Sequence, residues 1–132
     1  MEFILSYAVF AVVFGLVDAI WLVKVSKQFY QKEIGSLLAK KPDMTAAVVF
    51  YALYVLGVTV FVLQPAMTDE YWPVLAMGAL FGAVAYATYD LTNQATLKHW
   101  SKKVTVVDIA WGAFATGLAA VITALLTNWI LG

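Results

Sequence analysis

The chain lacks cysteine and arginine, has a single histidine, and carries few charged residues. The absence of cysteine excludes disulfide bonds, thiolate metal ligands and thiol nucleophiles. Charged residues make up 12% of the 132 residues, against about 25% in soluble domains. The formal net charge is zero, so the composition gives no indication of a nucleic-acid partner.

Motifs of the common catalytic classes are also missing. There is no glycine-rich phosphate loop, no His-x-Glu metal pair and no Gly-x-Ser-x-Gly nucleophile elbow. The histidine, His99, lies in a loop beside Trp100, and a lone loop histidine is more often solvated than catalytic. The sequence therefore predicts no metal site and no cofactor, and it leaves open whether the protein is an enzyme.

What the sequence has in excess is apolar residues, which amount to 64% of the chain. They form four segments, each long enough for the ~20 residues that cross a bilayer. Backbone groups in lipid must hydrogen-bond within their own segment, so each segment is expected to be a helix. The expected spans are Phe3–Val23, Ala46–Met67, Trp72–Leu97 and Val104–Leu131. These patterns predict an all-α integral membrane four-helix bundle, with residues 1–132 as one domain and the first span retained rather than cleaved.

The lysines predict the orientation of this bundle. All eight basic residues are lysines, and they occur only in the loops between spans one and two and between spans three and four. The loop between spans two and three carries Asp69 and Glu70 instead. Because positively charged loops stay in the cytoplasm, both termini are expected to face outward.

The first lysine-rich loop contains apolar residues at helical spacing. These residues are Val25, Phe29, Ile34, Leu37 and Leu38. With lysines and glutamines between them, they predict a short amphipathic helix at the inner headgroup region, ended by Pro42-Asp43. A basic helix attracts anionic lipid, so membrane lipids are expected partners. The alternative is a segment that merely tethers two spans.

Three aspartates lie within the expected spans, namely Asp18, Asp90 and Asp108. A carboxylate at mid-bilayer costs at least ~2.5–3.5 kcal/mol, so such acids normally face the bundle interior or water. Each aspartate lies close in sequence to an inner lysine, about 7–12 Å along the helix. The three acids are therefore expected at one level, in the cytoplasmic half of the membrane.

Other polar and aromatic residues share the inward faces of the spans at comparable depth. The candidate ligand-binding residues are Asp18, Asp90, Asp108, Tyr51, Tyr54, Tyr86, Tyr89, Asn93 and Trp111. We expect them to line a pocket open towards the cytoplasm. Two alternatives stay open. The acids could instead pair with snorkelling lysines, and Trp111 could be either one wall of a cation site or a packed core residue whose N–H is donated to a neighbour. Trp21 and Trp100 are assigned to an inner aromatic belt.

Gly78 and Gly82 form a small-xxx-small pattern that permits close contact between helices. We interpret it as a packing motif. Four spans enclose little volume, so a transporter of this size is expected to work as a homodimer, for which the same two glycines are a candidate contact.

The string Tyr86-Ala-Thr-Tyr-Asp-Leu-Thr-Asn93, followed by Asp108-Ile-Ala-Trp-Gly112, resembles a family of small bacterial predicted membrane proteins classed only as a domain of unknown function. Asp18-Ala-Ile-Trp-Leu22 and Phe50-Tyr51 with Tyr54 are similar to other marked positions of that family. The resemblance covers nearly the whole chain. It implies a multi-pass protein of the bacterial inner membrane with four spans, and it implies no activity, cofactor or catalytic residue.

Three functional hypotheses follow from these residues. The first is a membrane protein whose acidic and aromatic pocket binds or transports a cation or small molecule with proton coupling. The second is a membrane-embedded acid–base enzyme that acts on a lipid or isoprenoid at the inner leaflet. The third is an accessory membrane subunit in which the polar cluster only specifies packing.

Overall fold

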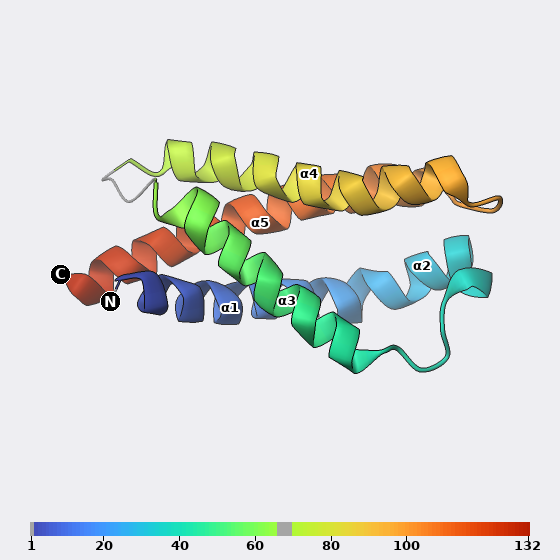
Figure 1. Ribbon diagram of the computed structural model, residues 1–132, viewed down its shortest axis with the longest axis horizontal. Coiled ribbons are helices and arrows are strands. Elements are labelled where there is room, and N and C mark those ends of the chain that lie inside the picture. Colours follow the sequence, from blue (N-terminus) through green and yellow to red (C-terminus); the bar gives the residue numbers. More distant parts are fainter. Residues whose placement is uncertain (1, 66–69) are drawn as a thin grey trace.

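The computed structural model describes residues 2–65 and 70–132, and those residues form helices and connecting segments without strands. Four helices are long and apolar enough to cross a membrane (Figure 1). The helices are α1 Glu2–Trp21, α2 Lys27–Ile34, α3 Met44–Val58, α4 Trp72–Thr96 and α5 Lys102–Leu131. The four-helix membrane bundle expected from the sequence is confirmed.

Two of the spans are prolonged by wide, π-helical turns. One turn, Leu22–Ser26, follows α1, and the other, Thr59–Leu63, follows α3. The second span therefore runs from Met44 to Leu63. Its expected end at Met67, like Asp69 of the acidic loop, lies outside the described residues.

The amphipathic stretch after the first span is helical, as expected, over Lys27–Ile34. It is not a separate helix set at an angle, because the wide turn joins α1 and α2 end to end into one long rod (Figure 1). With the short 3₁₀ turn Gly35–Leu37, this rod contains 36 residues. At 1.5 Å per residue it is about 54 Å long, whereas the hydrocarbon core is about 30 Å thick. The last part of the rod therefore extends beyond the hydrocarbon core, and its place among the headgroups stays a prediction.

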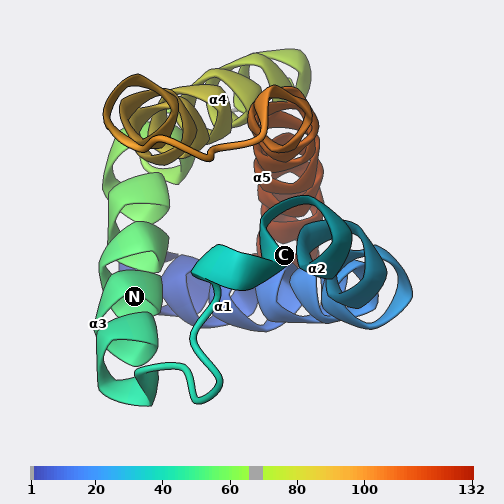
Figure 2. The same ribbon diagram turned by 90° about the vertical axis from the view of Figure 1, so that its right-hand side faces the viewer.

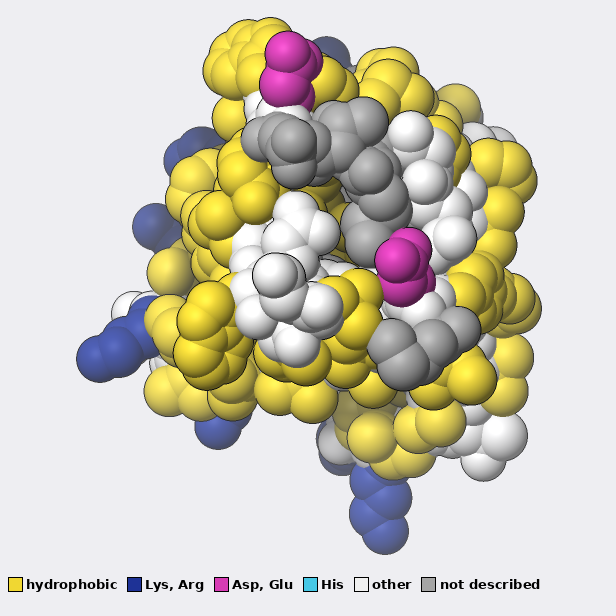
Figure 3. All heavy atoms as spheres, turned by 90° about the vertical axis from the view of Figure 1, so that its left-hand side faces the viewer, with side chains coloured by type: hydrophobic (Ala, Val, Ile, Leu, Met, Phe, Trp, Pro, Cys, Tyr) yellow, Lys and Arg dark blue, Asp and Glu magenta, His cyan; other side chains and the backbone are white. Residues whose placement is uncertain are grey.

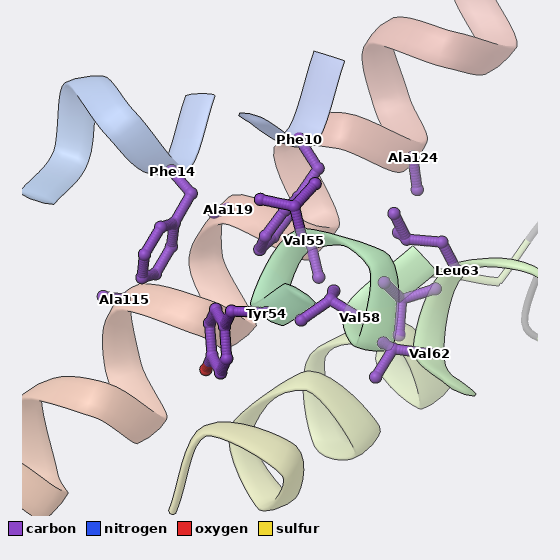
Figure 4. Packing of buried hydrophobic residues seen from close by; sticks show 12 residues of the cluster. Phe10, Phe14, Tyr54, Val55, Val58, Val62, Leu63, Ala115, Ala119 and Ala124 are labelled. Carbon is purple, nitrogen blue, oxygen red and sulfur yellow. The ribbon is translucent and has the colours of Figure 1, made fainter. Parts of the chain in front are cut away.

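The four long helices stand around the sides of a rough square when the bundle is viewed from the end opposite the termini (Figure 2). Helix α5 packs along both α4 and α1, and it buries more residues than any other described helix. Helix α3 crosses the bundle obliquely, from the side of α1 towards α4 (Figures 1 and 2). The hydrophobic core lies where α1, α3 and α5 meet, with Phe10 and Phe14 facing Val55 and Ala119 (Figure 4).

The two ends of the bundle differ in charge. The lysine-bearing loops lie at one end, and both termini lie at the other (Figure 1). Acidic side chains are visible on the end that carries the termini, while basic side chains project only from behind (Figure 3). The prediction that both termini face outward is based on this difference in charge between the two ends, and it stays a prediction.

Helices α4 and α5 pack closely through glycine. A Cβ atom added at Gly82 would lie 2.2 Å from the carbonyl oxygen of Gly112, and one added at Gly78 would lie 3.1 Å from the Cα of Gly117. The small-xxx-small pattern is thus buried against α5 of the same chain. These two glycines are not available as a contact for a second copy, and a homodimer stays a prediction without an assigned surface.

We predict that Gly82→Ala destabilises the bundle by about 1–3 kcal/mol, because the new methyl group meets backbone that has no room to retreat. Thermal unfolding in detergent measures the effect. Gly57→Ala is the matched control, since its Cβ would meet only the far end of the Phe81 ring, at 2.9 Å, and a side chain can move. Equal melting temperatures for the two variants would contradict this packing argument.

Candidate functional site

A cavity of about 240 Å³ lies at the lysine-bearing end of the bundle, enclosed by α1, α2, α4 and α5. We call it the acidic cavity. Its lining residues are Asp18, Trp21, Leu22, Ser26, Tyr30, Ile34, Leu38, Tyr86, Tyr89, Trp100, Val104, Asp108 and Trp111. Two carboxylic acids and six aromatic rings therefore surround one space, and no lysine is among the residues that line it.

The two acids of the cavity are hydrogen-bonded to aromatic side chains. Asp108, which is 8% exposed, accepts a hydrogen bond from the hydroxyl group of Tyr30 on α2. Asp18 accepts a long hydrogen bond, 3.5 Å, from the indole nitrogen of Trp111. Both acids thus turn towards aromatic partners across the cavity rather than pairing with the lysines of the neighbouring loops.

Stacked indoles form one wall of the acidic cavity. The rings of Trp21 and Trp111 lie parallel, with centroids 4.2 Å apart and an interplanar angle of 11°. Trp21 was assigned to the inner aromatic belt, and the structure instead holds it against Trp111 inside the bundle. Trp111 donates its N–H to a neighbour, Asp18, and it also lines the cavity, while its part in a cation site stays a prediction. Near the opening, Tyr89 and Trp100 meet edge to face at 5.7 Å.

Asp90 is the most buried of the described acids and does not line the cavity. It is fully buried between α4 and α5, with an exposed fraction of 0%. Neither carboxyl oxygen has a hydrogen-bond partner that meets the geometric criteria among the described residues. Its carboxyl group interacts electrostatically with that of Asp108, which in turn acts on Asp18. The three acids therefore come together, as their common depth predicts.

Three further candidate residues, besides Asp90, do not line the acidic cavity. The hydroxyl group of Tyr51 donates a hydrogen bond to the backbone carbonyl of Ala11 on α1. Tyr54 belongs to the buried core, where its hydroxyl group lies 2.6 Å from Thr116 Oγ1. Asn93 does not line the cavity, and its side chain interacts with Tyr89. The structure places these three residues in helix contacts, and it places Asp18, Tyr86, Tyr89, Asp108 and Trp111 on the cavity surface.

Sequence reasoning missed Tyr30, because the segment that carries it was considered only as a surface for lipid. A signal was present. Ser26, Tyr30 and Ile34 recur every fourth residue and therefore share one helix face, and all three line the cavity. The loop before α5 also packs against α2, since Ser101 donates a hydrogen bond of 2.7 Å to Glu33. Within the described residues, no group of three or more His, Cys, Asp or Glu side chains is arranged to hold a metal ion.

Comparison with known proteins gives one family match. A family model described as a predicted membrane protein (DUF2177) matches residues 3–125. No curated protein and no solved structure shows significant similarity to the chain. The family description carries no activity, so the chemistry of the site has to be argued from its own residues.

We predict that Tyr30→Phe loosens α2 from the bundle, because the hydroxyl group that reaches Asp108 is lost. A hydrogen bond to a charged group contributes about 1.5–3 kcal/mol, so amide hydrogen exchange in residues 27–38 should become about tenfold faster. Gln28→Ala, an exposed change on the same helix, is the control and should leave exchange unchanged. Equal exchange in the two variants would show that Tyr30 does not hold α2 in place.

Proposed function

Since the chain belongs to the DUF2177 family of predicted membrane proteins, we propose that this multi-pass membrane protein binds a small organic cation in its acidic cavity. The observation that carries the proposal is the lining itself, with two carboxylic acids, six aromatic rings and no basic side chain. We propose that the protein lies in the bacterial inner membrane. The cavity is at the same end as the lysine-rich loops, and such loops stay in the cytoplasm, so we propose that the cavity faces the cytoplasm.

Aromatic rings and carboxylates recognise a cation in complementary ways. An aromatic face attracts a cation by about 0.5–2 kcal/mol, and indole is the strongest of the three common rings. Trp21 and Trp111 offer such a surface beside Asp18, while Asp108 supplies a second negative charge across the cavity. Anionic ligands are disfavoured by the same two carboxylates, so the cavity selects for positive charge.

The lining favours an organic cation over a bare metal ion. Divalent metals need several oxygen or nitrogen ligands, and the described residues contain no group of three or more His, Cys, Asp or Glu side chains placed to supply them. Aromatic side chains instead suit an ammonium group that carries alkyl substituents, because such a cation keeps little of its hydration shell. The volume of about 240 Å³ has room for an ion of that kind.

Proton coupling is supported by the burial of Asp90. Ionising a fully buried carboxyl group without a hydrogen-bond partner among the described residues is costly, so we infer that Asp90 holds a proton. The carboxyl group of Asp108, at the cavity surface, lies within electrostatic range of Asp90, and so does the hydroxyl group of Tyr89. A cation bound at the cavity surface lowers the cost of a negative charge on Asp90 and therefore favours release of this proton.

The hydrogen bond between Tyr30 and Asp108 supports a second candidate function. A phenol bonded to a carboxylate at a cavity surface can transfer a proton to or from a bound molecule. The protein would then be an acid–base enzyme whose substrate enters from the inner leaflet. The two functions separate in detergent solution, where an enzyme converts its substrate and a binding or transport protein returns the ligand unchanged.

We predict that wild-type protein in nanodiscs binds radiolabelled tetramethylammonium and that Asp108→Asn weakens this binding about tenfold or more. A charged partner lost from the site is worth about 1.5–3 kcal/mol, and 1.4 kcal/mol corresponds to tenfold. Asp18→Asn should weaken binding in the same direction. Binding is measured by equilibrium dialysis, with circular dichroism to check that each variant is folded.

The matched control is Glu2→Gln, which removes an exposed carboxylate at the opposite end of the bundle. It should bind tetramethylammonium as the wild type does. Absence of binding by folded wild-type protein would falsify the proposal, and so would equal losses in the control and in Asp108→Asn.

A further inference from the structure

A second hollow, of about 380 Å³, adjoins the acidic cavity between α3 and α4. We call it the lateral groove. Its lining residues are Phe50, Ala85, Tyr86, Tyr89 and Asp108. Three of these residues, Tyr86, Tyr89 and Asp108, also line the acidic cavity. The two spaces are therefore neighbours, with Asp108 in the lining of both.

The lateral groove opens towards the surrounding lipid. Helix α3 crosses the bundle obliquely, so its beginning lies away from α4 (Figures 1 and 2). Every residue from 44 to 50 is exposed within the chain, and Phe50 at the groove is 58% exposed. These side chains are almost all apolar, as expected for a surface that contacts acyl chains in a bilayer. A hydrocarbon chain can thus reach the groove without crossing water.

We propose that the ligand is an amphipathic cation, with its ammonium group in the acidic cavity and one hydrocarbon chain in the lateral groove. This inference rests on the proposed function and specifies its substrate class. The shared lining carries it. A charged head bound near Asp108 lies next to the lateral groove, because Asp108, Tyr86 and Tyr89 line both spaces. Phe50 lines the groove on its exposed side.

The chemistry of the two spaces excludes neighbouring classes of ligand. A wholly apolar lipid would leave Asp18 and Asp108 facing a ligand with no charge to offer them. A phospholipid brings a phosphate group, which the two carboxylates repel and which no lysine in the lining offsets. A single-chain amine or quaternary ammonium compound carries a positive charge and has no phosphate group.

The test compares two probes with the same head, tetramethylammonium and dodecyltrimethylammonium. Wild-type protein in nanodiscs is loaded with radiolabelled tetramethylammonium, and each unlabelled probe is used to displace it. Ala85→Phe should fill the lateral groove and weaken displacement by dodecyltrimethylammonium about tenfold, with displacement by tetramethylammonium unchanged. Partitioning of the long probe into the nanodisc lipid is the same for all variants and cancels in the comparison.

Leu80→Phe is the matched control, because Leu80 lies on the same helix in a separate hollow with Phe61 and Met77. It should behave as the wild type with both probes. A second measurement does not depend on any variant. A dodecyltrimethylammonium analogue with a photoreactive diazirine at the end of its chain should label wild-type protein around Phe50 and Ala85, and excess tetramethylammonium should suppress that labelling.

The outcomes separate the two proposals. In one outcome tetramethylammonium binds, but dodecyltrimethylammonium displaces it equally well from Ala85→Phe and from Leu80→Phe, and the diazirine labels the lipid-facing surface evenly. That result overturns the amphipathic ligand and leaves cation binding standing. If tetramethylammonium does not bind to folded wild-type protein, the proposed function fails and the inference fails with it.

Discussion

The close approach of α4 and α5 is the constraint on which the site depends. Because Gly82 lets α4 approach the backbone of α5 at Gly112, and Gly112 leaves room for the ring of Tyr86, Asp90 on α4 and Asp108 on α5 lie within electrostatic range of each other. Asp90 is held against α5 with no hydrogen-bond partner among the described residues, and Asp108 is left to face both the cavity and its neighbour. A wider separation of these helices would expose the Asp90 carboxyl group, which the present packing buries completely.

The sequence predicts much of this arrangement, because length and charge placement act over whole segments. The four helices follow from the bilayer requirement that backbone groups bond within their own segment. The common level of Asp18, Asp90 and Asp108 follows from counting residues to the nearest lysine, and the structure brings the three acids together. The inward faces of α4 and α5 follow from the small residues along them.

Regular spacing shows that Ser26, Tyr30 and Ile34 share one face, but it could not predict that this face lies on the same side as Asp18. In an uninterrupted α-helix Tyr30 would lie about 120° around the axis from Asp18, facing away from the site. The wide turn Leu22–Ser26 places more residues in each turn, which brings the face of Tyr30 back towards Asp18 and the cavity. Tyr51 and Tyr54 were predicted to line the site but do not. Their depth suits the site, but the oblique path of α3 gives their hydroxyl groups partners on α1 and α5.

Because of this oblique path, only the second half of α3 is packed in the core. Tyr54, Val55 and Val58 anchor its second half in the core, while the first two turns touch no other helix closely enough to be covered. In a bilayer this exposed apolar half of α3 faces acyl chains. We therefore expect the thickness of the host membrane to influence the distance between the start of α3 and α4, and with it the width of the lateral groove beside Asp108.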